Sequence, residues 1–268
     1  MELAEEMLEF LQDIPKDLGL DWTKNLDFLY YFEAARMRLI RDALAKQGYA
    51  KDSRLNVLDV GYLHGLLPEF IQRNYLNVRF TVIDHPQSPI FNNPGYLKLI
   101  AGRNYLKLVP LDLKQVDSLT ETYDLIVLGE VVEHLDPTEV TKTLQELRKK
   151  INPGGLLLIT TPNAIGIFNA VMAFFEKDSI IVAPIPDPMM GYAHIHLWSP
   201  RLLEQTANYC SFKRVYLEFY NGREDEKFAY DAKHFSSWKH FIWLKFAEWI
   251  SNRFPSRRGF FVASFKPV

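Results

Sequence analysis

The chain has 268 residues, of which 48% are hydrophobic, and a formal net charge of −2. This length suits one large domain, or one domain with an inserted cap, and the hydrophobic share can fill a core. A net charge so close to zero gives no global attraction to nucleic acid, so we expect no nucleic-acid partner. The single cysteine, Cys210, excludes an internal disulfide and fits a cytoplasmic setting.

The chain shows no sign of secretion or of membrane insertion. Its start, MELAEEMLEF, is acidic and therefore does not read as a signal or transit peptide. It also lacks a run of about 18 apolar residues, so we expect no transmembrane helix.

Residues 1–50 are expected to form N-terminal helices, which precede a second unit over 51–268. Within 1–50, apolar side chains recur at helical spacing at positions 28, 29, 32, 35, 39 and 43, and Gly48 is a plausible stop. Strands and helices then alternate. The expected strands are 56–60, 79–83, 106–110, 125–128 and 156–160, separated by helical or loop-like segments at 65–74, 86–100 and 138–151. This rhythm predicts an α/β fold with a parallel sheet covered on both faces.

The rhythm changes after Pro162. A helix is expected over 199–209, with Ser199 as N-cap and Pro200 at its first position. Strands are expected over 213–220 and 259–265. The segments 163–198 and 222–258 are expected to form cap segments of the 51–268 domain.

Two strand ends carry the most informative residues. NVLDVGYLHGLL at 56–67 is an apolar strand that ends in Asp59 and enters a turn with Gly61 and Gly65. YDLIVLGEVVEHLDP at 123–137 is a second apolar strand, which ends in Gly129. Open α/β sheets hold their ligands at the carboxyl ends of such strands, so a ligand site is expected there.

These motifs, together with VIDHP, the DL at Asp112 and NPGGLLLITTPN, resemble the class I S-adenosylmethionine-dependent methyltransferases. The resemblance is strongest over residues 54–163 and is nearest to ubiquinone-type enzymes and to methyltransferases of glycan, lipid and natural-product pathways. It implies a Rossmann-like, seven-stranded, mostly parallel sheet with helices on both faces and a helical cap. It also implies methyl transfer from S-adenosyl-L-methionine to a small-molecule, glycan or lipid-linked acceptor, at oxygen.

The resemblance also assigns cofactor-binding residues. Asp59, Gly61 and Gly65 would hold the amino-acid end of the cofactor, and Glu130 would lie at its methionine end. Asp84 would accept hydrogen bonds from the ribose hydroxyls. Asp112, with Leu113 beside it, would contact the adenine. Leu63 stands where the family usually has a third glycine, which keeps open the alternative of a nucleotide-binding protein without catalysis.

Glu130, Glu133 and His134 lie at i, i+3 and i+4, so they can share one face of a helix or turn. One interpretation is structural, with Glu130 bonding nearby amides and His134 acting as a hydrogen-bonded linker. The other is a divalent metal site that takes His194 as a fourth ligand. Such a set also occurs in metal-dependent RNA 2′-O-methyltransferases, which are therefore an alternative function. His134 and His194 are in addition the candidate catalytic bases.

The segment 235–258 is aromatic and basic. It holds Trp238, Trp243 and Trp249, and Glu248 is its sole acidic residue. Such a helix can lie on a membrane surface, which would make the protein peripheral to a membrane. The alternative is a cap helix that buries its aromatic side chains on the core or on a partner. The oligomeric state is left open.

Overall fold

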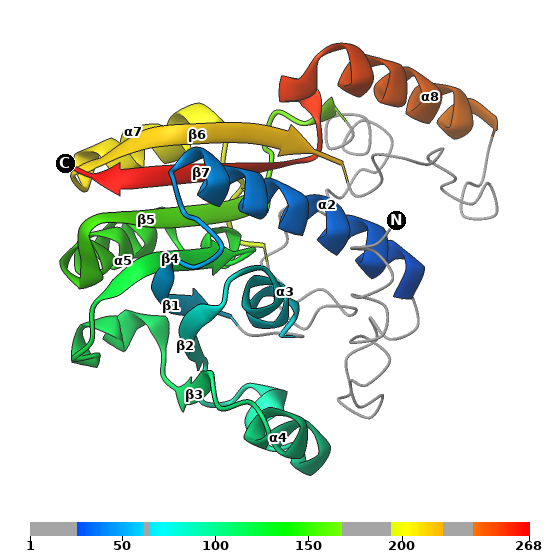
Figure 1. Ribbon diagram of the computed structural model, residues 1–268. Coiled ribbons are helices and arrows are strands. Elements are labelled where there is room, and N and C mark those ends of the chain that lie inside the picture. Colours follow the sequence, from blue (N-terminus) through cyan, green and yellow to red (C-terminus); the bar gives the residue numbers. More distant parts are fainter. Residues whose placement is uncertain (1–25, 62–64, 168–193, 222–237) are drawn as a thin grey trace.

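The structure, a computed structural model, describes residues 26–61, 65–167, 194–221 and 238–268 (Figure 1). The helices are α2 (Leu26–Lys46), α3 (Leu66–Asn74), α4 (Pro94–Ala101), α5 (Pro137–Lys150), α7 (Pro200–Tyr209) and α8 (Trp238–Arg253). The strands are β1 (Arg54–Val60), β2 (Asn77–Asp84), β3 (Leu106–Pro110), β4 (Tyr123–Gly129), β5 (Ile151–Pro162), β6 (Phe212–Tyr220) and β7 (Phe260–Pro267). Short 3₁₀ helices are η2 (Pro89–Phe91), η3 (Leu113–Ser118), η4 (Val132–His134) and η6 (Pro255–Arg257).

The seven strands form one sheet in the order β3-β2-β1-β4-β5-β7-β6. β1 to β5 pair in parallel, whereas β7 runs antiparallel to both β5 and β6. The expected mostly parallel sheet with a final antiparallel strand is therefore confirmed. The chain order reverses between β1 and β4, the place where doubly wound sheets open a crevice for a ligand.

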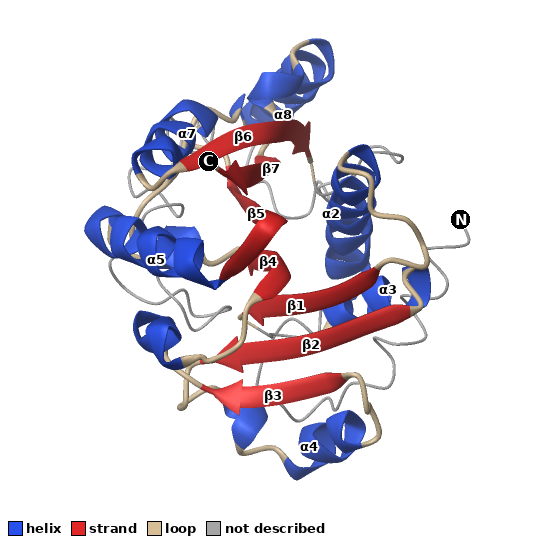
Figure 2. Ribbon diagram, turned by 60° about the vertical axis from the view of Figure 1, so that its left-hand side comes forward, coloured by secondary structure: helices blue, strands red, loops and turns tan. Residues whose placement is uncertain are grey.

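The central strands are apolar on both sides because helices cover both faces of the sheet. Val57 and Val127 face a core with α2 and α3, and Leu58 and Ile126 face a second core with α5 and α7. Figure 2 shows α2 and α3 on one side of the strands and α5 and α7 on the other. The ends of the strands are thus the parts of the sheet that remain for binding.

Local signals at helix ends behave as the sequence predicts. The Ser199 hydroxyl accepts a hydrogen bond from the Leu202 backbone N–H at 3.2 Å, and Pro200 opens α7. Asp136 and Glu139 form a capping box at the start of α5. Gly48 follows the end of α2 with a φ of 86°, a conformation that suits glycine.

β5 differs from its predicted bounds, 156–160, because it begins at Ile151. Asn152-Pro153-Gly154-Gly155, a sequence that predicts a turn before this strand, lies inside it, where the register against β4 shifts between Tyr123 and Leu125. Gly154 has a φ of 80°, so the glycines allow an irregularity in the strand rather than a turn before it.

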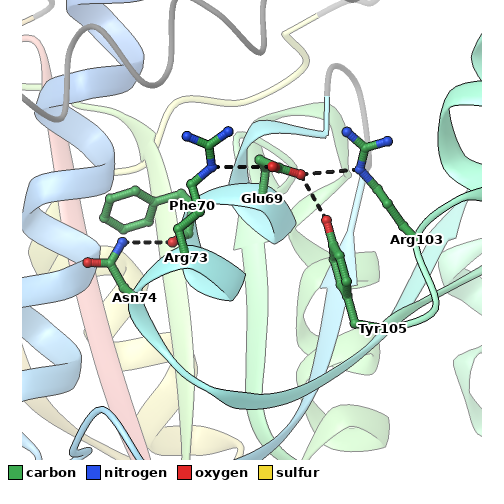
Figure 3. Close-up of polar contacts among 6 residues, drawn as sticks. All are labelled: Glu69, Phe70, Arg73, Asn74, Arg103 and Tyr105. Carbon is green, nitrogen blue, oxygen red and sulfur yellow. Dashed lines mark hydrogen bonds and ion pairs between the residues drawn. The ribbon is translucent and has the colours of Figure 1, made fainter.

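A polar cluster fastens α3 to the approach to β3. One oxygen of the Glu69 carboxylate lies 3.3 Å from Arg73 Nε, and the other accepts bonds from Arg103 Nε at 3.2 Å and Tyr105 Oη at 2.8 Å (Figure 3). The pKa of Glu69 is lowered, since burial, which acts against its charge, is outweighed by Tyr105 and Arg103. The cluster positions α3, whose first turn faces the end of β1.

The expected cap is described only in part. Residues 1–25, 168–193 and 222–237 lie outside the described residues, and with them most of the predicted N-terminal and cap segments. α8 is the described helix of the cap region. Among the described helices, none has both the length and the hydropathy of a membrane-spanning segment.

Candidate active site

The turn after β1 is shaped for close approach to a ligand. Gly61 has a φ of 80°, and a Cβ atom there would lie 3.2 Å from Val131 Cγ2. Gly65 has a φ of 70° and stands at the N-cap of α3, with no side-chain cap in the described structure. α3 thus begins shortly after β1 ends, the arrangement in which a helix N-terminus can hold an anionic group of a ligand. Leu63 lies outside the described residues.

The next two strand ends carry carboxylates. Asp84 ends β2 half-buried, and its Oδ1 accepts the backbone N–H of His85 at 2.7 Å. Asp112 caps η3 by accepting the Lys114 N–H at 2.9 Å, while its Oδ2 lies 3.9 Å from His85 Nε2. Leu113 is buried beside it. Asp84 and Asp112 thus lie at the same edge as Gly61, although one oxygen of each is engaged by a local backbone group.

Asp59 is buried beneath this edge, and only 3% of it is exposed. Burial raises its pKa to about 8; the guanidinium of Arg36 acts against this rise, and Asp84 adds to it. Arg36 comes from α2 and is itself buried, with its Nη2 2.5 Å from Glu33 Oε2. Burial lowers the pKa of Arg36, but the surrounding acids, Glu33 foremost, outweigh burial, so the pKa is raised overall.

Glu130 follows β4 in a strained backbone conformation. Its φ is 55°, and in the described part of the chain Ser211 is the one other non-glycine residue with positive φ. The Glu130 N–H donates to Thr160 O at 3.0 Å, and its carboxylate accepts from Tyr220 Oη at 3.4 Å. Burial raises the pKa of Glu130, and Arg36 opposes the rise. A strained backbone conformation persists only where the surrounding structure stabilises it, and residues in such conformations cluster at functional sites.

Glu133, His134 and His194 come together at the end of β4. One potential ligand atom from each of the three lies within 4.8 Å of the others. The rings of His134 and His194 have centroids 4.9 Å apart. Glu130, which the sequence placed in the same set, is not part of this trio. η4 covers only Val132–His134, so Glu130 precedes it and does not share a helical face with Glu133 and His134 as expected.

The segment 194–198 reaches the end of β4 through backbone bonds. The N–H groups of Ile195 and His196 donate to the Glu133 carbonyl at 2.8 and 3.2 Å. Trp198 is buried, and its indole N–H donates to Val132 O at 3.0 Å. Asn163, just after β5, and Trp198 pair in an isolated parallel β-bridge. His194 is therefore held beside His134 although 60 residues separate them.

The donor set at the trio fits a divalent cation. Glu133 is fully buried; its Oε2 accepts from Thr161 Oγ1 at 2.9 Å, whereas its Oε1 has no hydrogen-bonding partner among the described residues. Burial, with the charge of Glu130 next, raises the pKa of Glu133 well above its ordinary value. A buried carboxylate in this state favours a proton or a cation beside it. Two imidazoles and one carboxylate are a common ligand set for such ions.

The sequence reasoning found the strand-end residues but missed Glu33, Arg36 and Tyr220. A signal for two of them was present: on α2, Glu33 and Arg36 lie on the same side as Met37 and Ile40, which are buried. A charged pair at i and i+3 among apolar positions suggests a buried ion pair. Tyr220 ends β6, which is far from β4 in the chain, and no local pattern connects it with Glu130.

The fold is that of an α/β protein whose strand order reverses between β1 and β4, and the candidate site residues gather at that edge of the sheet. A model of a methyltransferase domain family matches residues 31–213, which is more than half of the chain, and the chain belongs to this family.

Individual relatives are more distant. The chain is 29% identical over 165 residues to a ubiquinone biosynthesis O-methyltransferase of Rhizobium etli, a match that covers 57% of this chain and 61% of that protein. The mouse mitochondrial protein of that name is 29% identical over 164 residues, which cover 58% of this chain and 43% of its own. The chain thus spans less than two thirds of the length of these curated relatives.

Among solved structures, the N-methyltransferase NodS from Bradyrhizobium japonicum, in complex with S-adenosyl-L-homocysteine, matches with a TM-score of 0.57. The two are 16% identical, and the match covers 97% of this chain and 98% of NodS. This likeness confirms the Rossmann-like methyltransferase fold.

Proposed function

We propose that this protein transfers a methyl group from S-adenosyl-L-methionine to a hydroxyl oxygen of a small-molecule acceptor. The observation that carries the proposal is the convergence of the ligand-shaped edge after β1, β2 and β3 with a histidine pair at the end of β4. Family membership supports the reaction class. The O-methyltransferase names of the Rhizobium and mouse relatives support an oxygen acceptor.

The cofactor would be held by the strand ends. Gly61 and Gly65 would let the backbone approach its amino-acid end, and the positive end of the α3 dipole would favour a carboxylate there. The carboxylates of Asp84 and Asp112 would accept from the ribose and the adenine. Arg36 would balance the charge of the acids around the methionine end. Leu113 and Glu130 complete the proposed set.

The bound cofactor supplies an electrophilic methyl carbon, so the work left to the protein is alignment and proton removal. Holding the acceptor oxygen in line with that carbon can contribute about 7–11 kcal/mol. As the carbon–oxygen bond forms and the carbon–sulfur bond breaks, the hydroxyl proton must leave. An imidazole nitrogen of His134 or His194 would accept it, since a histidine side chain titrates near the operating pH.

A divalent cation at Glu133, His134 and His194 is the alternative way to lower the barrier. Such an ion lowers the pKa of a coordinated hydroxyl. If it is bound, the two histidines act as ligands and are no longer available as bases. The Glu133 Oε1 atom, which has no hydrogen-bonding partner among the described residues, supports this alternative, and the grouped ligand atoms would provide three protein ligands, from Glu133, His134 and His194.

We further propose that the acceptor is linked to a lipid and that the protein contacts a membrane surface. Exposed aromatic side chains on α8 support both, since α8 is attached to the same edge of the sheet as the site.

Cofactor binding is tested by calorimetry with S-adenosyl-L-homocysteine. We expect the wild type to bind, and Asp84→Ala to bind about a hundredfold more weakly, because a charge-assisted hydrogen bond is worth about 1.5–3 kcal/mol. The matched control is Asp52→Ala, an exposed aspartate outside the site. A wild type that does not bind at millimolar ligand would remove the methyltransferase proposal.

The two ways of removing the proton are separated by turnover with a panel of phenols, sugars and lipid-linked glycans. Loss of activity in EDTA, restored by added divalent ion, would identify the cation mechanism. Activity that persists in EDTA but falls in the His134→Ala, His194→Ala double variant would identify the base. Binding without any turnover would leave a nucleotide-binding protein.

A further inference from the structure

α8 has two opposite faces. Ile242, Phe246 and Trp249 lie at i, i+4 and i+7 and are 54%, 43% and 61% exposed, whereas Ala247 and Ser251 on the other side are fully buried. The rings of Phe246 and Trp249 stack, with centroids 6.1 Å apart and an interplanar angle of 21°. Among the side chains of α8 that the structure describes, small ones are thus buried against the domain and large apolar ones face outward.

The segment that carries the exposed stripe is rich in basic residues. Residues 238–258 contain one acidic residue, Glu248, and it pairs with Lys245 at 2.6 Å. The basic residues of this segment are Lys239, Lys245, Arg253, Arg257 and Arg258. Five basic residues and one acidic residue give this segment a net charge of +4, although the whole chain carries −2, so the rest of the chain carries −6. A surface of this kind matches a negatively charged partner.

Buried polar contacts fix α8 to the carboxyl edge of the sheet, where the candidate active site lies. The Asn221 amide, just after β6, donates to Ser251 Oγ at 3.2 Å, and its oxygen accepts the Gly259 N–H at 2.9 Å. Asn163, just after β5, donates to the carbonyls of Ser256 and Arg258 at 3.0 and 2.8 Å. These bonds place α8 and η6 beside the end of β5, and Figure 1 shows α8 next to the end of β6.

We propose that the outer face of α8, formed by Ile242, Phe246 and Trp249 with Phe254 after it, is a docking surface for an anionic lipid bilayer. Stacked aromatic side chains would enter the boundary between headgroups and acyl chains, and the neighbouring basic side chains would pair with lipid phosphates. A second copy of this chain fits less well, because a twofold interface would bring the two basic segments together.

One consequence of this docking surface rests on the proposed function. Because α8 is attached to the edge that holds the site, a membrane-bound protein would receive a lipid-linked acceptor directly from the bilayer.

Co-sedimentation of the full chain with vesicles tests the docking surface. One set of vesicles is phosphatidylcholine alone, and the other contains phosphatidylglycerol as well. We expect binding to the anionic vesicles at low salt, weaker binding at high salt, and little binding to phosphatidylcholine alone. Phe246→Ser with Trp249→Ser, and separately Arg253→Glu, should each lower the partition coefficient about tenfold or more.

The matched controls are Tyr209→Ser, an aromatic residue 75% exposed on α7, and Lys107→Glu, an exposed lysine on β3. Both should bind like the wild type. No pelleting of the wild type at low salt, or an equal loss in the controls, would overturn the proposal. So would sedimentation velocity showing that the α8 variant changes a dimer into a monomer without affecting vesicle binding.

Calorimetry with S-adenosyl-L-homocysteine on the same preparations separates the two proposals. Vesicle binding without ligand binding would retain the docking surface and remove the methyltransferase, and ligand binding without vesicle binding would do the opposite.

Discussion

The guanidinium of Arg36 is the positive charge that the acids of the site share. Glu33, Asp59 and Glu130 all interact with it electrostatically. Removing one partner of a buried ion pair is costly, because the remaining charges stay buried without compensation. Arg36 therefore contributes to stability as well as to the proposed charge balance at the cofactor.

We predict that Arg36→Met destabilises the fold by about 3–5 kcal/mol. Urea denaturation measures this. Arg41→Met, at a half-buried position on the same helix where the arginine side chain is 43% exposed, should change stability by less than about 0.5 kcal/mol. The double variant Glu33→Gln, Arg36→Met should recover part of the loss, since it removes one uncompensated acid. Equal stability of Arg36→Met and wild type would contradict the central position of this charge.

Asp59 makes stability depend on pH. Burial raises the pKa of Asp59 to about 8 in the folded protein, from an ordinary value of 3.8. Between these values the folded state holds a proton that the unfolded state has released. Raising the pH through this window therefore favours unfolding, by as much as about 1.4 kcal/mol per pH unit for one proton.

We predict that the wild type loses about 2 kcal/mol more than Asp59→Asn when the pH rises from about 6 to about 8. The two proteins are compared by urea denaturation at both pH values. Other titrating groups, such as Glu130, contribute to both proteins, so the difference reports Asp59. Parallel pH profiles would show that Asp59 is already ionised in the folded state.

At the scale of elements, the position of α8 depends on the contacts that attach it to the sheet. Among its described side chains, Ala247 and Ser251 are fully buried, and Ser251 accepts a hydrogen bond from the Asn221 amide, so this polar contact adds specificity to the docking of the helix. Buried polar contacts of this kind fix one arrangement, because leaving a partner unsatisfied is costly.

We predict that Asn221→Ala loosens α8 without unfolding the domain. The lost acceptor leaves the Gly259 N–H unsatisfied, at a cost of about 1–3 kcal/mol. Hydrogen exchange should quicken over 238–253 and stay unchanged over β1 and β4. Asn252→Ala, at an exposed position of α8, is the control. Unchanged protection of α8 in Asn221→Ala would show that other contacts hold the helix.

At the scale of the whole molecule, two hydrophobic cores cover the two faces of one sheet, which leaves the carboxyl edge of the strands as the candidate binding edge. A ligand that binds this edge only in the folded state adds its binding energy to the stability of the fold. We predict that S-adenosyl-L-homocysteine at a hundredfold excess over its dissociation constant stabilises the protein by about 2.7 kcal/mol. Thermal denaturation with and without the ligand measures this, with adenosine as the control ligand. No shift in the midpoint would contradict binding at this edge.

The strands, the sheet type and the site edge followed from the sequence because local patterns determine them. Continuous apolar runs predict strands buried on both faces, and Asp59, Asp84 and Asp112 are recognised by their places at strand ends. The start of α7 at Ser199 and the turn at Gly48 likewise depend on neighbouring residues. The segment 152–155 was interpreted as a turn because its glycines suit both a turn and an irregular strand, and pairing with β4 decided between them.

By itself, then, the sequence determined the α/β fold, the family and the strand-end residues, since each is written in neighbouring positions. The tertiary structure alone decided that His194 joins Glu133 and His134 while Glu130 turns towards Tyr220 and Arg36. It also decided which side of α8 faces outward, although the apolar residues of that helix occur almost all round. Those outcomes depend on contacts between segments far apart in the chain, and no local pattern encodes which of several favourable partners a side chain meets.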